Sequence, residues 1–296
     1  MTLECQSPCK INLLLNILGK RTDGYHEVET VLYPVFFCDR LHFEKGGQGI
    51  QFSCTHPDLP ADSTNLVWRA ASLFLQATRP GNGIRIHLEK NIPLGAGLGG
   101  GSSNAATTLL ALNDLFDHPM TEPQLRAMAR DLGADVPFFL QNKPALGTGR
   151  GEQIAPIECF PALRNAHLLL IHPGFGISTA WAYQQLARFP GAFNGEPGRA
   201  RRLIALLESG DLTSAGPAFY NALEAPAFAK YPILALFQES LQDHGAAVAR
   251  MSGSGSTIFA IFDSEARLEE GVHQFKRKFD DHFWMRTLPL QIGPRQ

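Results

Sequence analysis

The sequence predicts an α+β fold in two lobes, and three observations lead to that prediction. The chain has 296 residues, a length that suits one large domain or two of ordinary size. Segments with the two-residue period of a strand and segments with the periodicity of a helix are interleaved along its length. They lack the strict strand–helix–strand alternation of a parallel sheet, which favours α+β over α/β. We therefore expect one domain over residues 1–158 and a second over residues 159–296.

The elements of the first half are predicted from alternation, caps and glycines. In residues 10–17, Lys10 and Asn12 fall on one face of a strand whose other face is apolar. A glycine-rich loop then separates a strand from a helix at residues 93–101. The elements expected here are strands over 10–17, 28–37, 41–43 and 84–88, a turn at Gly46-Gly47, and helices over 65–77, 102–116 and from Thr121 to a C-cap at Gly133.

The second half shows the same mixture. Ser178 is placed to cap a helix that runs to about Ala187, and Gly245 is placed to end another. The remaining elements expected here are strands over 167–171, 246–250, 257–262 and 283–290, helices over 199–208, 231–243 and 264–279, and a loop over 189–198.

Composition and charge exclude several classes of protein. Lys plus Arg is 26 and Asp plus Glu is 28, a formal charge of −2, and no basic stripe interrupts this balance, so we expect no nucleic-acid partner. No apolar run approaches the ~18–20 residues of a membrane-spanning helix, so we expect no membrane contact. The apolar stretch at 11–18 contains Asn12 and Asn16, which indicates a strand and not a signal peptide.

The five cysteines also limit the possibilities. Their number is odd and they form no Cys-x-x-Cys pair, so we expect neither a zinc site nor a disulfide framework. Reduced thiols are typical of cytoplasmic proteins, and we predict that location. Nothing in the sequence points to an obligate protein partner.

The segment Pro-Leu-Gly-Ala-Gly-Leu-Gly-Gly-Gly-Ser-Ser at 93–103 is the strongest local signal. Glycines let a ligand approach the main chain, and the first turn of the following helix offers free N–H groups to an anion. A dinucleotide-binding reading needs an acid at the end of a second strand, but the acids here, Asp114 and Asp117, fall in or just after the helix. A P-loop needs Gly-Lys-Ser/Thr, and this loop has no lysine. A flexible surface turn is the remaining alternative.

This pattern resembles the phosphate-binding motif of the GHMP small-molecule kinases. Two further segments agree in order: residues 7–13 (Ser-Pro-Cys-Lys-Ile-Asn-Leu) resemble the first family motif, and residues 251–257 (Met-Ser-Gly-Ser-Gly-Ser-Thr) resemble the third. Segments at 19–26, 132–138 and 148–152 narrow the resemblance to a member that acts on a cytidine-diphosphate-linked methylerythritol. The resemblance is thinnest from about 185 to 245, and Cys9 stands where alanine is common.

The resemblance implies a two-lobed GHMP-kinase fold with the active site in the cleft between the lobes. It implies phosphorylation of the 2-hydroxyl of that substrate by ATP with Mg²⁺, as a step in making isoprenoid precursors by the non-mevalonate pathway. The implied ATP-binding residues are Pro93, Leu94, Gly95, Ala96, Gly97, Leu98, Gly99, Gly100, Gly101, Ser102 and Ser103. The sequence leaves the metal ligands open, with Ser103 as one candidate. The implied substrate-binding residues are Asn12, Tyr25, His26, Tyr183, Gly253, Ser254 and Gly255.

Lys10 and Asp135 are the implied catalytic pair. Asp135 lies on a turn between a helix stop and Pro137, where a carboxylate can accept the proton of an attacking hydroxyl. Lys10, in a leucine-rich strand, would hold that carboxylate ionised and stabilise charge on the reacting oxygens. From the residues alone, Asp135 also fits a turn-former and Lys10 a strand-end lysine that reaches solvent. Tyr25 and His26 also fit ordinary loop residues, Tyr183 a core-facing tyrosine, and residues 252–256 a plain hairpin turn.

Three other functions stay open at this point. A kinase of the same family with another substrate, such as homoserine or mevalonate, would be indifferent to cytidine. A ligand sensor on the same fold would bind nucleotide without turnover, and a Rossmann oxidoreductase would bind NAD.

Overall fold

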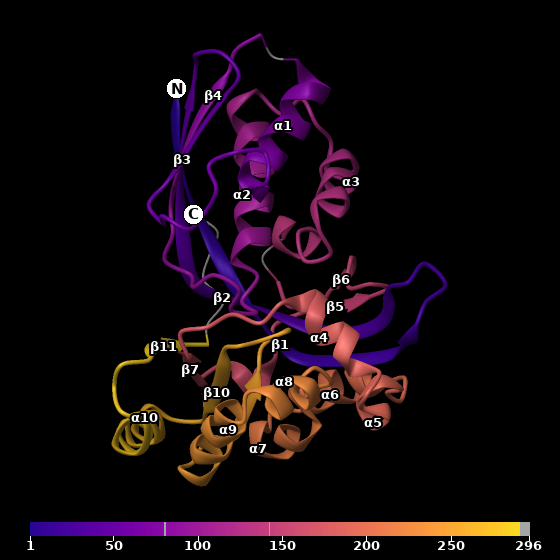
Figure 1. Ribbon diagram of the computed structural model, residues 1–296, viewed down its shortest axis with the longest axis vertical. Helices are drawn as coiled ribbons and strands as arrows, with labels where there is room; N and C mark the ends of the chain where they lie inside the picture. The colour runs from indigo at the N-terminus through magenta and orange to yellow at the C-terminus, as the bar shows by residue number, and fades with distance from the viewer. Residues whose placement is uncertain (80, 142, 291–296) are drawn as a thin grey trace.

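Two lobes gather around a long hairpin in the computed structural model, which describes residues 1–79, 81–141 and 143–290 (Figure 1). The elements of the first half are β1 (Thr2–Lys20), β2 (His26–Lys45), β3 (Ile50–Cys54), α1 (Leu66–Thr78), β4 (Ile84–Glu89), α2 (Gly100–Leu115), α3 (Glu122–Leu132), the 3-10 turn η1 (Pro137–Leu140), β5 (Ala145–Thr148) and β6 (Gln153–Pro156). Those of the second half are η2 (Pro161–Leu163), β7 (His167–His172), α4 (Thr179–Leu186), α5 (Pro190–Phe193), α6 (Arg199–Glu208), α7 (Leu212–Ala215), η3 (Gly216–Ala218), β8 (Tyr220–Asn221), α8 (Glu224–Lys230), α9 (Ile233–Asp243), β9 (Val248–Met251), β10 (Ile258–Phe262), α10 (Glu265–Phe279) and β11 (Trp284–Pro289).

The hairpin of β1 and β2 is the backbone of the larger sheet, whose order is β3-β4-β2-β1-β8 with β5 on β2 and β6 on β5. The strands predicted over 10–17, 28–37 and 41–43 are parts of these two longer strands. Shifts in pairing between Pro8 and Cys9 and between Asn12 and Leu14 mark bulges in β1. Because a bulge bends a strand and increases its twist, this one hairpin can contribute to the packing of both lobes.

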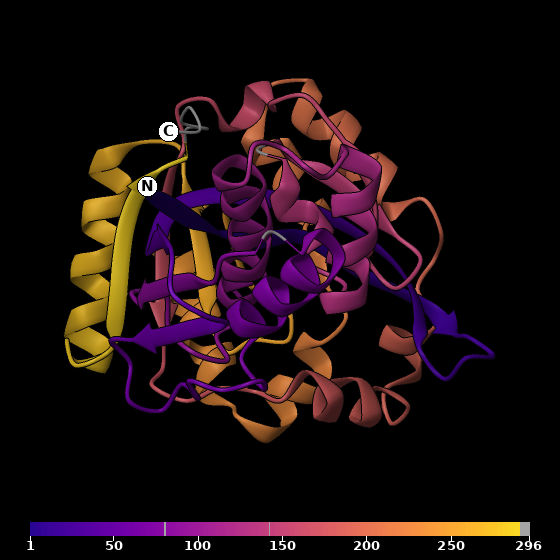
Figure 2. The ribbon, with the colours of Figure 1, turned by 90° about the horizontal axis from the view of Figure 1, so that it is seen from above.

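Helices α1, α2 and α3 lie together on one face of this sheet (Figures 1 and 2). Asn65 caps α1 by accepting the N–H of Val67, and Thr121 opens α3 with a capping box. The middle helix α2 is largely buried, with small residues such as Ala105 and Ala106 against the sheet. The glycine-rich loop is therefore held between a strand and a helix that are both fixed by the core.

The smaller sheet has the order β11-β7-β10-β9 and is antiparallel throughout. Helices α9 and α10 pack on it through an aromatic cluster that includes Phe237 and Phe275. The short strand β8 also belongs to the second half of the chain, but it joins the larger sheet, where it pairs in parallel with β1 at Leu14 and Leu15. The strands and helices of both halves confirm the α+β class.

One prediction was wrong and several elements were not foreseen. The loop expected over 189–198 contains the helical turn α5, which begins at Pro190. Its Phe193 ring meets the ring of His26, so a tertiary contact and a proline at the first position stabilise a turn with no periodic signal. The short elements β3, β5, β6, α7 and α8 also lacked such a signal. Among the described helices, none has both the length and the apolar character needed to cross a membrane.

Candidate active site

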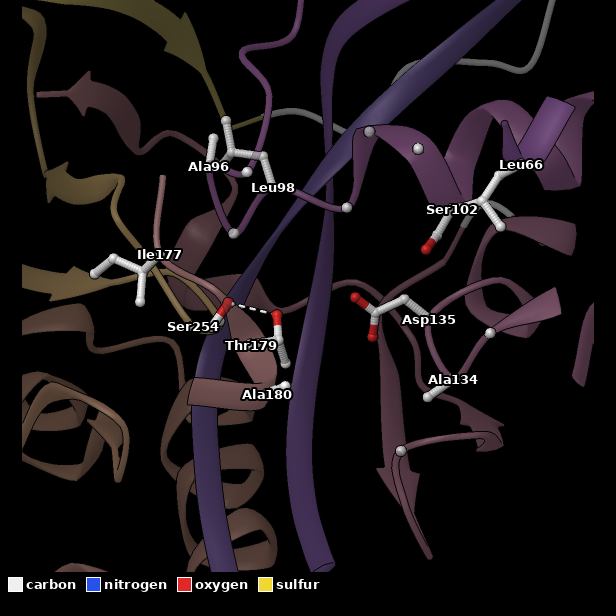
Figure 3. Close-up of a pocket in the computed structure, with 18 of the residues that line it drawn as sticks. Leu66, Ala96, Leu98, Ser102, Ala134, Asp135, Ile177, Thr179, Ala180 and Ser254 are labelled. Carbon is white, nitrogen blue, oxygen red and sulfur yellow. Dashed lines mark hydrogen bonds between the residues drawn. The ribbon is translucent and has the colours of Figure 1, made fainter. Parts of the chain in front are cut away.

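A cavity of about 1380 Å³ opens between the two lobes. Strand β1, the glycine-rich loop and the turn after α3 contribute part of its wall, and α4 and the loop after β9 contribute another part. Figure 3 shows Ser102 and Asp135 facing the same space from one side, with Thr179 and Ser254 on the other. The cavity thus collects segments that are far apart in the sequence.

The glycine-rich loop passes along this cavity in a conformation that requires glycine. Gly95, Gly97 and Gly99 have φ angles of 61°, 75° and 70°, in the left-handed region. A Cβ on Gly97 would lie 2.0 Å from the carbonyl oxygen of Ser252, so the two loops touch main chain to main chain. All of the predicted residues from 93 to 102 line the cavity. The first N–H groups of α2 begin at Gly100, where no intrahelical acceptor is available to them.

Ser103 lies apart from the rest of that motif. Its side chain is fully buried, and its hydroxyl accepts a hydrogen bond of 2.8 Å from the hydroxyl of Ser7. Its N–H donates to the carbonyl of Gly99, within the helix. Because neighbouring helix positions point in different directions, Ser102 faces the cavity while Ser103 packs against β1.

Lys10 and Asp135, 125 positions apart in the sequence, meet in the wall of the cavity. The Nζ atom of Lys10 lies 3.8 Å from Oδ2 of Asp135. The lysine side chain is 4% exposed and the aspartate side chain 40% exposed, so the carboxylate is the accessible partner. Burial lowers the pKa of Lys10, and the charge of Asp135 opposes that effect. An ion pair beside a loop with free N–H groups can receive a hydroxyl and a negative group.

Three sequence motifs converge on the amine of Lys10. It donates to Oδ1 of Asn12 at 2.5 Å and to the carbonyl oxygen of Gly97 at 2.8 Å. The amide of Asn12 in turn donates to the hydroxyl of Thr30, and Ser252 donates its hydroxyl to the same Gly97 carbonyl at 2.9 Å. Lys10 and Asn12 share a face, as the strand period predicts, and both line the cavity.

The loop after β9 presents two of its three predicted residues. Gly253 and Ser254 line the cavity, and the Ser254 and Thr179 hydroxyls are 2.9 Å apart (Figure 3). Gly255 does not line it: its N–H donates to the carbonyl of Ser252, and a Cβ there would meet Met251. The turn therefore directs one glycine to the cavity and the other to the core.

Aromatic residues form another part of the cavity wall. The ring centroids of His26 and Tyr183 lie 5.0 Å apart, and the rings of His26 and Phe193 form a T-shaped pair with centroids 5.7 Å apart. Burial lowers the pKa of His26, and the charge of Lys20 lowers it further, which favours the neutral imidazole. Tyr25 is 56% exposed and also lines the cavity. This aromatic part of the cavity offers flat apolar ring faces, and the neutral His26 imidazole offers one donor and one acceptor nitrogen.

Sequence reasoning missed two further cavity groups. Arg150, in the turn between β5 and β6, places its guanidinium carbon 4.7 Å from the centre of the Tyr25 ring. Lys90 forms a buried ion pair of 2.5 Å with Asp39, whose other oxygen accepts the N–H groups of residues 91 and 92. The Thr-Gly-Arg-Gly-Glu segment was a signal for Arg150, whereas nothing in the sequence pairs positions 39 and 90.

Comparisons with known proteins agree with this geometry. Family models described as the GHMP kinases N terminal domain and the GHMP kinases C terminal match residues 65–143 and 203–281. A 4-diphosphocytidyl-2-C-methyl-D-erythritol kinase of Synechococcus sp. is 39% identical, covering 93% of this chain and 90% of that protein. The enzyme of that name from Methylacidiphilum infernorum is 43% identical, covering 88% and 86%.

Solved structures give the same result. A crystal structure of 4-(cytidine 5'-diphospho)-2C-methyl-D-erythritol kinase has a TM-score of 0.79 and 36% identity, covering 97% of this chain and 99% of that one. Homoserine kinase from Cytophaga hutchinsonii has a TM-score of 0.75 at 21% identity, covering 97% and 93%, which shows the shared fold. The chain belongs to the 4-diphosphocytidyl-2-C-methyl-D-erythritol kinases of the GHMP kinase family.

Proposed function

We propose that this chain transfers the terminal phosphoryl group of ATP to the 2-hydroxyl of 4-diphosphocytidyl-2-C-methyl-D-erythritol, in the non-mevalonate route to isoprenoid precursors. The observation that supports the proposal most directly is the 3.8 Å ion pair of Lys10 and Asp135 at the mouth of the glycine-rich loop. Family membership supports the substrate, because the relatives carry that name.

The two catalytic residues have different tasks in this proposal. The exposed carboxylate of Asp135 accepts the hydroxyl proton as the hydroxyl oxygen attacks the phosphorus atom and the bond to ADP breaks. The buried ammonium of Lys10 stays in place and offsets the negative charge that develops on the transferred group. Hydrogen bonds to Gly97 and Asn12 fix the position of that ammonium. It can therefore stabilise the transition state without first being reoriented.

The ATP phosphates lie, in this proposal, against residues 95–102 at the amino end of α2. Free N–H groups and the positive end of the helix dipole favour a polyanion there. Ser102 offers a hydroxyl in the cavity beside Asp135 (Figure 3). Among the described residues, no group of three or more His, Cys, Asp or Glu side chains is placed to hold a metal alone. That suits Mg²⁺, which binds mainly phosphates and water, and the Ser102 hydroxyl would help to hold it while it neutralises phosphate charge.

The aromatic part of the cavity is assigned to the cytosine base. Tyr25 and Tyr183 supply ring faces for stacking, and His26 supplies hydrogen bonds to the base edge. Asn12, Gly253 and Ser254 also line the cavity, and the methylerythritol would be placed beside them, close to the catalytic pair.

The experiment compares the variants Asp135→Asn and Lys10→Met with the unchanged protein. ATP consumption is measured with each of three acceptors: the cytidine diphosphate compound, homoserine and mevalonate. We expect turnover of the cytidine compound alone, inhibition by CDP, and a loss of about 10²–10⁴-fold in kcat for Asp135→Asn with ATP binding retained. Near-normal turnover of Asp135→Asn would remove it as the base. Turnover of another acceptor would change the substrate, and nucleotide binding without turnover would indicate a sensor.

The domain boundary at residue 158, the cytoplasmic location and the roles of Ser103 and Gly255 stay predictions. Ser103 and Gly255 would act on ligands through the segments they support, since neither lines the cavity.

A further inference from the structure

A buried turn at residues 221–224 supports the loop that carries Gly253. It follows β8, which pairs with β1 at Leu14 and Leu15, and it leads into α8. Asn221 is 2% exposed and lies between these elements and the end of β9. The turn is thus fixed on one side by the strand that carries Lys10.

Asn221 satisfies the loop carbonyls with one amide group. Its Nδ2 atom donates to the carbonyl oxygen of Met251 at 2.7 Å and to that of Gly253 at 2.8 Å. Its Oδ1 atom accepts the N–H of Leu223 at 2.9 Å, so all the hydrogen-bonding groups of the amide are used.

Glu224 holds the same loop through a backbone N–H group, whereas Asn221 binds backbone carbonyls. Its carboxylate accepts the N–H of Met251 at 2.8 Å. Among the described residues, Arg250 on β9 is the charged side chain that acts on it. The Arg250 guanidinium donates to the carbonyls of Phe219 and Ala249, and Glu224 forms no ion pair within the described part of the chain. The carboxylate is therefore buried with a backbone N–H as its closest partner.

The supported loop touches the catalytic centre. A Cβ on Gly253 would lie 3.1 Å from Nζ of Lys10, 3.1 Å from the carbonyl oxygen of Gly97 and 3.3 Å from Oδ1 of Asn12. There is no spare space at this point, so a small shift of residues 251–254 changes the surroundings of the Lys10 ammonium.

We propose that Asn221 and Glu224 are positioning residues, which hold residues 251–254 against Lys10 and the glycine-rich loop, and that the ionised form of Glu224 is the form that does so. The kinetic part of this inference rests on the proposed function. Neither side chain lines the cavity, so both act through the loop.

Burial gives this support a dependence on pH. Desolvation raises the pKa of Glu224 to about 7, with Arg250 and the Met251 N–H opposing the shift. Above that pH the carboxylate makes a charge-assisted hydrogen bond, which is roughly twice as strong as a neutral one. Below it the protonated acid accepts more weakly, so the loop is held less firmly at acid pH.

The main test is Glu224→Gln, which keeps the shape and an acceptor oxygen but removes the charge. The rate constant kcat/KM for the acceptor is measured from pH 6 to 9, and hydrogen–deuterium exchange is followed at residues 251–254. We expect kcat/KM to fall about three- to tenfold above pH 7, with the step near pH 7 lost, and exchange of the loop to increase. Glu224→Asp keeps the charge and should therefore restore part of the change in kcat/KM near pH 7. Asn221→Ala should increase hydrogen–deuterium exchange of the loop but retain that change in kcat/KM.

Glu29→Gln is the matched control, because Glu29 also accepts a backbone N–H, that of Gly198, away from this loop. We expect the control to leave both the pH profile and the exchange of residues 251–254 unchanged. A Glu224→Gln profile that superimposes on that of the unchanged protein, with equal loop exchange, would overturn the proposal. Exchange needs no substrate, so increased exchange in a protein that does not turn over the cytidine compound would refute the proposed function and leave the support by Glu224 standing.

Discussion

Replacing Gly97 by alanine tests whether contact between the two glycine-containing loops builds the active site. Gly97 has a φ of 75°, and an added Cβ would lie 2.0 Å from the carbonyl oxygen of Ser252. That oxygen belongs to main chain, so the overlap is relieved only if one loop moves away from the other. The two loops then separate at the point where Lys10 is held.

The structure gives a magnitude for this change. A left-handed backbone costs an alanine about 1–2 kcal/mol relative to glycine. The Gly97 carbonyl also accepts bonds from Lys10 at 2.8 Å and Ser252 at 2.9 Å, and losing each costs about 1 kcal/mol or more. The free energy of unfolding should fall by about 3–4 kcal/mol, which lowers the Tm of a chain of this size by about 5–7 °C.

Differential scanning calorimetry and kcat/KM measure the outcome for Gly97→Ala, and Gly101→Ala is a control for stability alone, because Gly101 lies in the part of the loop assigned to ATP. Gly101 is inside α2, where a Cβ would make an ordinary contact of 3.5 Å with Leu66. Alanine there should raise the free energy of unfolding by about 0.4–1 kcal/mol. If Gly97→Ala melts within 2 °C of the unchanged protein and keeps its activity, the loops do not depend on this close approach and the reasoning is wrong.

Three further predictions concern buried or cavity-lining charges. Asp39→Asn leaves the ammonium of Lys90, which is 3% exposed, without its negative partner, so urea denaturation should show a loss of about 3–5 kcal/mol. Arg150→Gln removes a cation that lies over the Tyr25 ring in the cavity, so steady-state kinetics should show KM for the cytidine diphosphate compound rising about tenfold while KM for ATP stays unchanged. Glu224 has a folded-state pKa of about 7 against a usual 4.5, so its ionisation disfavours the folded state as pH rises from about 4.5 to 7. Glu224→Gln should therefore raise the free energy of unfolding by about 3 kcal/mol above pH 7 and by little at pH 4.5, as measured by denaturation at both values.

The stability and kinetic effects of Glu224→Gln have opposite signs in this account. If Glu224 only stabilised the fold, its substitution would lower the free energy of unfolding and kcat/KM together. Equal stability of the variant and the unchanged protein at pH 8 would show that the carboxylate carries no burial penalty.

Local patterns predicted the parts of the site that depend on local geometry. The two-residue period of a strand placed Lys10 and Asn12 on one face, and their contact at 2.5 Å follows from it. The glycine-rich loop was located because strand and helix patterns end on either side of it. The meeting of Lys10 with Asp135 needed the family resemblance, because no local rule relates residues so far apart.

Details within a motif depended on the fold. Ser102 and Ser103 are equivalent in sequence, but their positions on α2 direct one to the cavity and the other to Ser7. Gly253 and Gly255 alternate with serines, and only the turn of the loop decides which of them lines the cavity. A motif therefore predicted the location of the site more reliably than the role of each residue in it.

The surroundings of Lys10 determine how the catalytic pair divides its work. Two of its three N–H donors are used by Asn12 and Gly97, at 2.5 and 2.8 Å. The distance to Asp135, 3.8 Å, is longer than a hydrogen bond, so the third donor can serve an oxygen of the reacting groups. Loss of the Lys10 proton would leave only the two donors that Asn12 and Gly97 use, and it would remove both the charge beside Asp135 and the donor for the reacting oxygens. In the proposed mechanism Lys10 therefore acts as a fixed positive charge, and Asp135, with its accessible carboxylate, is the member of the pair assigned to take up the proton.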